Sequence, residues 1–103
     1  MAIAEVTVVP LGTEDTGLSE YVADCQDVLA KEESIEYQLT PMGTIIEGEL
    51  DDILVAIRKI HEVPFVNGAE RVTTNIKIDD RRDKEASMNQ KLNSVENKLT
   101  EGE

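Results

Sequence analysis

The chain has 103 residues, which is enough for one small domain with a thin core. Its 22 acidic and 10 basic residues give a formal net charge of −12, and such a surface repels nucleic-acid backbones and anionic membranes. With one Phe, two Tyr and no Trp, it also has few rings on which bases could stack. We therefore expect neither nucleic acid nor membrane as a partner. The acidity is compatible with a cationic ligand, although most acidic surfaces simply face water.

Cys25 is the single cysteine, so the chain can form no internal disulfide and has no cysteine spacing typical of a metal site. The first residues lack the basic and apolar regions of a signal peptide. No apolar run approaches the roughly 20 residues needed to cross a bilayer. The expected location is the cytoplasm, with no bound metal.

The chain opens with alternating apolar and polar residues, which is typical of a half-buried strand. This pattern predicts strands at 2–9, 35–40, 44–48 and 72–78. Helical spacing predicts one helix from Ser19 to about Glu33, with Val22, Cys25 and Leu29 in its apolar stripe. A second helix carries Leu50, Ile53, Leu54, Ile57 and Ile60, and Pro64 is expected to end it. A third, polar helix is predicted over about 84–99, and 100–103 should fray.

The predicted order β-α-β-β-α-β is the ferredoxin-like arrangement, an α+β fold in which two helices cover one face of a four-stranded antiparallel sheet. The chain would then be one domain over 1–99, with the C-terminal helix as an addition. Its narrow apolar seam must dock on its own domain or on a neighbour. The uncovered face of the sheet suits a subunit interface or the floor of a ligand site, and it is expected to carry some or all of Glu5, Thr7, Glu36, Gln38, Thr73, Asn75 and Lys77.

Two turns repeat the pattern Pro-x-Gly-Thr, at 10–13 and 41–44. Strands one and two run parallel in this topology, so both turns lie at the same end of the sheet. Glycine backbone and threonine hydroxyls can cradle a polar ligand there, although the pattern is also ordinary turn chemistry. Glu47 is either a ligand contact or an ordinary polar-face residue. The candidate ligand-binding residues are Thr13, Thr44, Glu47, Thr73 and Asn75.

No catalytic constellation emerges from the sequence. Ser19 is explained as a helix N-cap, and Cys25 as a buried core thiol. His61, the single histidine, lies near the apolar stripe of the second helix and has no second histidine or cysteine as a metal partner. We expect a protein that is not an enzyme.

Four ordered segments give the chain a family resemblance: 10–13 (PLGT), 37–44 (YQLTPMGT), 46–48 (IEG) and 71–84 (RVTTNIKIDDRRDK). Together they resemble the small thiamine-binding protein family. The resemblance implies a ferredoxin-like fold, homo-oligomers (dimers or tetramers), and non-catalytic binding of thiamine or its hydroxymethylpyrimidine part, with no other cofactor. The alternative is a structural or regulatory homo-oligomeric module without a small-molecule ligand.

Overall fold

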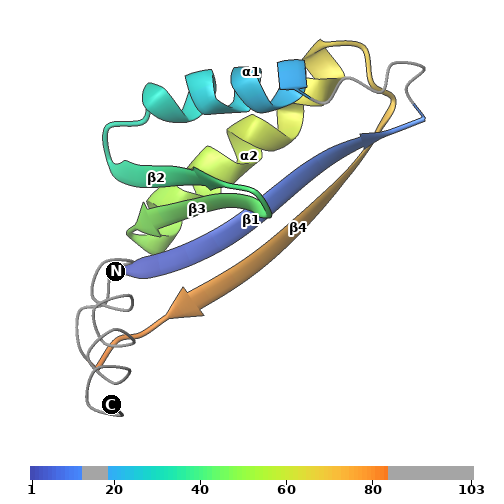
Figure 1. The fold of residues 1–103 in the computed structure, drawn as a ribbon. Coiled ribbons are helices and arrows are strands. Elements are labelled where there is room, and N and C mark those ends of the chain that lie inside the picture. Colours follow the sequence, from blue (N-terminus) through green and yellow to red (C-terminus); the bar gives the residue numbers. More distant parts are fainter. Residues whose placement is uncertain (13–18, 84–103) are drawn as a thin grey trace, which may run out of the picture.

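The computed structural model describes residues 1–12 and 19–83. In chain order the elements are β1 (Ala2–Leu11), α1 (Ser19–Ala30), β2 (Ile35–Thr40), β3 (Gly43–Gly48), α2 (Leu50–Val66) and β4 (Arg71–Asp80) (Figure 1). The predicted α+β, ferredoxin-like order is confirmed. The helix predicted at 84–99 and the tail at 100–103 lie outside the described residues.

The four strands form one antiparallel sheet in the order β2-β3-β1-β4. Both helices lie on the same face of this sheet (Figure 1). β1 pairs with β3 only from Ala2 to Val6, but with β4 along its whole length, to Leu11. The β1–β4 ladder therefore extends past the end of β3. Pro10 falls in this extension, where the missing N–H of proline removes no bond to β3, so β1 continues beyond its predicted end.

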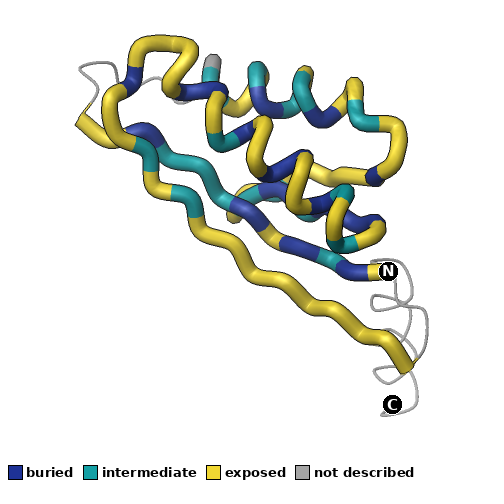
Figure 2. The backbone as a smooth tube through the Cα atoms, turned by 180° about the vertical axis from the view of Figure 1, so that it is seen from behind, coloured by how far each residue is buried: buried dark blue, intermediate teal, exposed yellow. Residues whose placement is uncertain are grey.

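The core lies between the sheet and the two helices, with Cys25 and Leu29 from α1 and most of the helical residues from α2. Small residues on the helix-facing side of β1, Ala2 and Ala4, allow the helix to approach the sheet closely. Ile53, Ile57 and Ile60 of α2 pack there, and the dark blue stretches of Figure 2 mark this layer. Leu54 was predicted to belong to the apolar stripe but is exposed. It is rotated by about 100° from Ile53 around the helix axis, and so points past the sheet.

The prediction that Pro64 ends the second helix is wrong, because α2 continues to Val66. The helix instead ends at Asn67 and Gly68, where Gly68 N–H bonds to the Phe65 carbonyl at 3.1 Å and Ala69 N–H bonds to the Pro64 carbonyl at 2.9 Å. These two bonds, with Gly68 at φ 100°, form a Schellman motif. Pro64 itself is buried in the core, and that burial offsets the hydrogen bond that a proline cannot donate.

The carbonyl that Pro64 leaves without its helical partner belongs to Ile60, one turn earlier. Cys25 on α1 supplies a replacement, because its Sγ donates to the Ile60 carbonyl oxygen at 3.8 Å. The thiol thus joins the two helices at a gap in the hydrogen bonding of α2. Among the residues that the structure describes, no helix has the length and hydropathy needed to span a membrane.

Candidate functional site

A pocket of about 260 Å³ lies between α1, β1 and the turn that joins β2 to β3. Its lining is mostly apolar, with Tyr21 and Cys25 from α1 and Ile60 from α2. Pro10 of the first Pro-x-Gly-Thr segment and Pro41 of the second both line it. The prediction that these segments lie at the same end of the sheet is confirmed.

The β2–β3 turn is held by its own side chains. Thr40 Oγ1 donates to the Gly43 carbonyl at 2.8 Å and accepts from the Met42 N–H at 3.2 Å. Thr7 Oγ1 on β1 donates to the Met42 carbonyl at 3.4 Å. Gly43 has φ 152°, and a Cβ there would lie 2.9 Å from the Val6 carbonyl oxygen. The turn can lie this close to β1 only because residue 43 has no side chain.

One polar pair lies within the mostly apolar lining. Gln26 Nε2 on α1 donates to Thr44 Oγ1 on β3 at 3.2 Å, and Thr44 is only 8% exposed. A hydroxyl that accepts one hydrogen bond still has its own proton to donate, and the Gln26 side chain has a carbonyl oxygen that can accept. The pair can therefore present a donor and an acceptor side by side.

Cys25 is buried at the same pocket, as the sequence predicted for a core thiol. Burial, and secondarily the nearby Asp24 carboxylate, raises the pKa of the Cys25 thiol from 9.0 to about 11. Because thiolate is the reactive form, such a thiol is poorly suited to nucleophilic chemistry at neutral pH.

We expect the Cys25 thiol of the native protein to react slowly with a thiol reagent such as DTNB at pH 8. Raising the pKa from 9.0 to about 11 lowers the thiolate fraction at pH 8 by roughly a hundredfold. Burial slows the reaction further. The control is the same protein unfolded in urea, where one thiol per chain should react rapidly. Fast reaction of the folded protein would contradict the assignment of Cys25 as a core residue.

The candidate ligand residues do not come together in one place. Thr44 lies on the helix-facing side and lines the pocket. The strand register places Glu47 opposite Ile3, Thr73 opposite Val9 and Asn75 opposite Thr7, and all of these lie on the face that the helices leave open. Thr13 lies outside the described residues. The sequence pattern identified the strands but not the separation of Thr44 from the other three by the thickness of the sheet.

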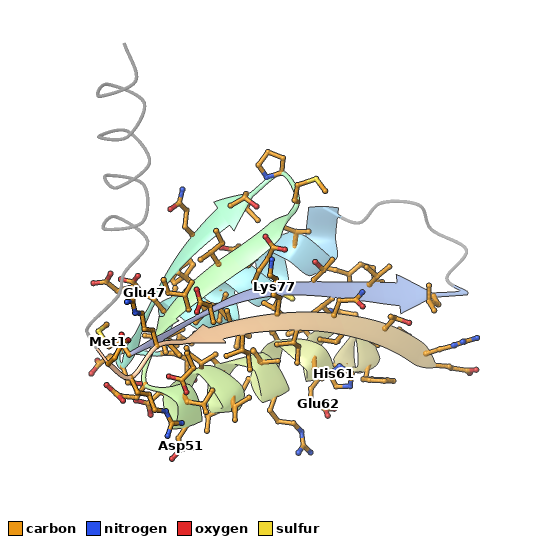
Figure 3. All side chains as sticks on the ribbon, turned by 90° about the horizontal axis from the view of Figure 1, so that it is seen from below. Met1, Glu47, Asp51, His61, Glu62 and Lys77 are labelled. Carbon is orange, nitrogen blue, oxygen red and sulfur yellow. The ribbon has the colours of Figure 1, made fainter. Side chains whose placement is uncertain are left out.

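The open face has a paired carboxylate at one end. Glu47 is only 7% exposed and lies beside Glu36 of β2 in the register. The pKa of Glu36 is raised, first by a side-chain hydrogen bond to Glu47 and then by repulsion from its charge. Figure 3 shows Glu47 and Lys77 on the side of the sheet opposite to His61 and Glu62 of α2. Glu47 therefore faces away from the pocket.

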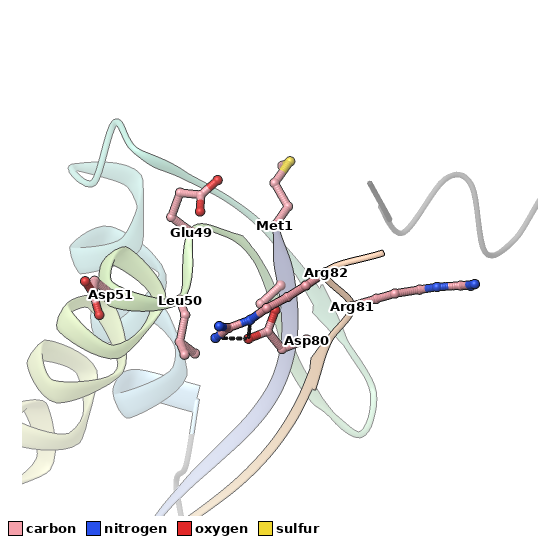
Figure 4. Close-up of a pocket in the computed structure, with 8 residues that line it drawn as sticks. Met1, Glu49, Leu50, Asp51, Asp80, Arg81 and Arg82 are labelled. Atoms are coloured by element: carbon pink, nitrogen blue, oxygen red, sulfur yellow. Dashed lines mark hydrogen bonds and ion pairs between the residues drawn. The ribbon is translucent and has the colours of Figure 1, made fainter. Parts of the chain in front are cut away.

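A second cavity, of about 660 Å³, lies at the start of α2 and the end of β4 (Figure 4). Its two arginines already have carboxylate partners: Arg82 Nη2 lies 2.9 Å from Asp80 Oδ2, and Arg81 is paired with Asp83. Glu49 and Asp51 add further negative charge. It is wide and polar, and contains none of the residues that the sequence predicted for the site. We therefore favour the smaller pocket as the ligand site.

The His61 side chain contacts β4 and its own helix, α2. Its Nδ1 lies 2.6 Å from Thr74 Oγ1 of β4, and its ring contacts the Phe65 ring edge-on at a centroid distance of 5.6 Å. Within residues 1–12 and 19–83, no cluster of three or more His, Cys, Asp or Glu side chains is arranged to hold a metal ion.

Sequence reasoning missed Gln26 and Tyr21. A glutamine on a helix resembles any other surface residue, and only the packing of α1 over β3 brings it to Thr44. Tyr21 is next to Val22 of the apolar stripe of the first helix, a position that indicates core packing rather than a pocket. Neither residue belongs to a short motif by which it could have been found.

Fold and pocket together define a ferredoxin-like α+β domain with a small, mostly apolar cavity at one end of its sheet. Residues 4–96 match the family model described as "Thiamine-binding protein", and the chain belongs to this family. It is 54% identical to UPF0045 protein YqgV of Bacillus subtilis, over 96% of this chain and 98% of that protein. Another relative, from Staphylococcus xylosus, is 49% identical over 99% of this chain and 98% of its own. The crystal structure of the hypothetical protein MJ1052 from Methanocaldococcus jannaschii superposes with a TM-score of 0.81 at 36% identity, covering 91% of this chain and 94% of that one.

Proposed function

We propose that the protein binds thiamine or its hydroxymethylpyrimidine part, without catalysis, in the pocket formed by α1, β1 and the β2–β3 turn. The observation that carries this proposal is the Gln26–Thr44 pair, a half-buried amide and a buried hydroxyl in a lining that is otherwise mostly apolar. Membership of the thiamine-binding protein family supports the choice of ligand.

In this proposal the pocket holds the pyrimidine half of the ligand. Sites for small ligands are typically lined by apolar side chains, with a few precisely placed polar groups that fix the orientation of the ligand. Thr44 would donate to a ring nitrogen, and the Gln26 carbonyl oxygen would accept from the exocyclic amine. At about 260 Å³ the pocket lies just below the usual range for drug-sized ligands, roughly 300–1,000 Å³, and so suits one substituted ring.

The rest of the ligand would extend towards solvent. The pocket opens beside Met42 and Leu39, which are exposed apolar residues. The cationic thiazolium of thiamine would be attracted by the net charge of −12, and a phosphorylated form would be repelled. The assembly would be a homo-oligomer, a dimer or a tetramer, and the cytoplasm remains the expected compartment.

The test is a calorimetric titration and a thermal-shift measurement with thiamine and with the pyrimidine alcohol. A ligand that binds only the folded state stabilises it by about 2.7 kcal/mol at a hundredfold excess over Kd. Thr44→Val keeps the shape but removes the hydroxyl, and we expect it to raise Kd by roughly three- to tenfold, the value of one net hydrogen bond. Gln26→Leu should act similarly.

The matched controls are Thr73→Val and Glu47→Gln on the open face of the sheet. If the pocket is the site, both should leave Kd unchanged. If they raise Kd while Thr44→Val does not, the ligand binds on the open face, and the pocket assignment fails. No binding at millimolar thiamine or pyrimidine alcohol would refute the proposal and favour the structural homo-oligomeric module.

A further inference from the structure

One backbone carbonyl of α2, that of Ile60, lies at the pocket without its usual helical partner. In a regular helix the N–H of residue 64 bonds to the carbonyl of residue 60, but residue 64 is a proline and has no N–H. The proline ring also clashes with the carbonyl four residues earlier, which weakens the regular bonding of the helix at this point. Pro64 is buried, and Ile60 lines the pocket. The proline thus leaves a hydrogen-bond acceptor on the wall of the ligand site.

The donor that replaces the missing N–H is weak. Cys25 Sγ lies 3.8 Å from the Ile60 carbonyl oxygen, and a thiol is a poor hydrogen-bond donor. An N–H donor makes a stronger bond to oxygen, at about 2.9 Å. Cys25 and Ile60 line the same pocket, so the thiol and the carbonyl meet at one of its walls. A ligand N–H that displaced the thiol would replace a weak bond by a stronger one.

We infer that the Ile60 carbonyl, left open by Pro64, is a third polar group of the ligand site and selects ligands with an exocyclic amine. This inference rests on the proposed function and names the class of ligand that the site accepts. An amine on a pyrimidine ring carries two N–H donors. One of them bonds to Gln26 in the proposed site, and the other needs an acceptor in a lining that is mostly apolar. The Ile60 carbonyl supplies this acceptor.

The energetics of burial explain the selection. An N–H that enters an apolar pocket without an acceptor loses its hydrogen bonds to water, and that penalty exceeds the value of the bond itself. With the Ile60 carbonyl in place, both N–H groups of the amine are paired, and Thr44 donates to a ring nitrogen. A pyrimidine with hydrogen in place of the amine makes neither amine bond. We therefore expect the aminopyrimidine to bind roughly tenfold more tightly or better.

The test is a calorimetric titration with two probes, the pyrimidine alcohol of thiamine and its analogue with hydrogen in place of the exocyclic amine. The ratio of their two dissociation constants measures how strongly the site prefers the amine. A change in the volume of the core affects both probes alike and cancels in this ratio. A change in the hydrogen bonding of the Ile60 carbonyl does not cancel.

Pro64→Ala restores the helical N–H, which then occupies the Ile60 carbonyl, and alanine keeps the helix because it is the best helix former. We expect the preference for the amine to fall roughly three- to tenfold, the value of one net hydrogen bond. Val63→Ala is the matched control, because Val63 is a buried neighbour on α2 that does not line the pocket. It shortens a core side chain without adding a backbone donor, so the ratio should stay unchanged. Far-UV circular dichroism checks that both variants are folded.

The thiol gives two independent measurements. Cys25→Ala removes the competing donor, so the preference for the amine should stay the same or rise. Cys25 is the single thiol of the chain, and its S–H stretching band can therefore be followed in the infrared. When the pyrimidine alcohol binds, the thiol should lose its bond to the carbonyl, and the band should move to higher frequency. The analogue without the amine should leave the band in place.

An unchanged ratio in folded Pro64→Ala, a lower preference in Cys25→Ala, or an S–H band that does not move would overturn the inference. If Pro64→Ala does not fold, the infrared measurement on the unmodified chain decides. The proposed ligand site would survive such a failure as long as Thr44→Val weakens the binding of both probes, because both keep the ring nitrogens. If neither probe binds, the inference fails together with the proposed function.

Discussion

Gly43→Ala is expected to lower the free energy of unfolding by about 2–6 kcal/mol. The positive φ of 152° is unfavourable for a residue with a side chain, at a cost of roughly 1–3 kcal/mol. The new methyl group would also lie 2.9 Å from the Val6 carbonyl oxygen and 3.0 Å from Thr7 Oγ1. The Val6 oxygen belongs to the backbone of β1, so it cannot rotate away, and forced overpacking typically costs a further 1–3 kcal/mol or so.

Urea unfolding followed by far-UV circular dichroism measures this effect, since the chain has no Trp. Gly68→Ala is the matched control, because Gly68 has φ 100° but a Cβ there would meet nothing within 4 Å. It should therefore show the conformational cost alone, about 1–2 kcal/mol. If both substitutions cost the same, the close approach of the turn to β1 does not contribute to stability.

The fold could be predicted because alternating apolar and polar residues indicate each strand, and an apolar stripe at helical spacing indicates each helix. The strand register then follows from the burial of Ala4, Val6 and Ile46 on one face, since a slip of one residue would expose them. The end of α2 was missed for a physical reason. A proline normally ends a helix, but here Pro64 is buried, and the Ile60 carbonyl has a thiol partner on α1. Such tertiary compensation has no local signal.

The candidate site was only partly predictable. The repeated Pro-x-Gly-Thr pattern located the correct end of the sheet, and Thr44 is in the pocket that forms there. Glu47 was left open between a ligand contact and an ordinary polar residue, and the structure places it deeply buried beside Glu36. Successive residues of a strand point to opposite faces, so the face of a residue depends on whether its position along the strand is odd or even. Thr44 and Glu47 differ by three positions, so they point to opposite sides of β3.

The second large effect is expected for Ile60→Ala, which should lower the free energy of unfolding by about 2–5 kcal/mol, the range for isoleucine truncation in a core. Ile60 is buried on α2 and also lines the pocket. Ile53→Ala is the matched control, because Ile53 is equally buried on the same helix but does not line the pocket.

Both alanine variants should be destabilised by similar amounts in urea unfolding. Only the Ile60 variant should bind thiamine or its pyrimidine alcohol more weakly, because it removes a side chain against which the ring would pack. If an alanine variant is too unstable to titrate, the same comparison is made by calorimetry on folded protein with Ile60→Val and Ile53→Val. Each of these should lower the free energy of unfolding by only about 0.5–1.5 kcal/mol. Equal ligand affinity in the Ile60 and Ile53 variants, both matching the unmodified chain, would place the ligand elsewhere. A loss of affinity in both would mean that binding responds to general core stability rather than to the shape of this pocket.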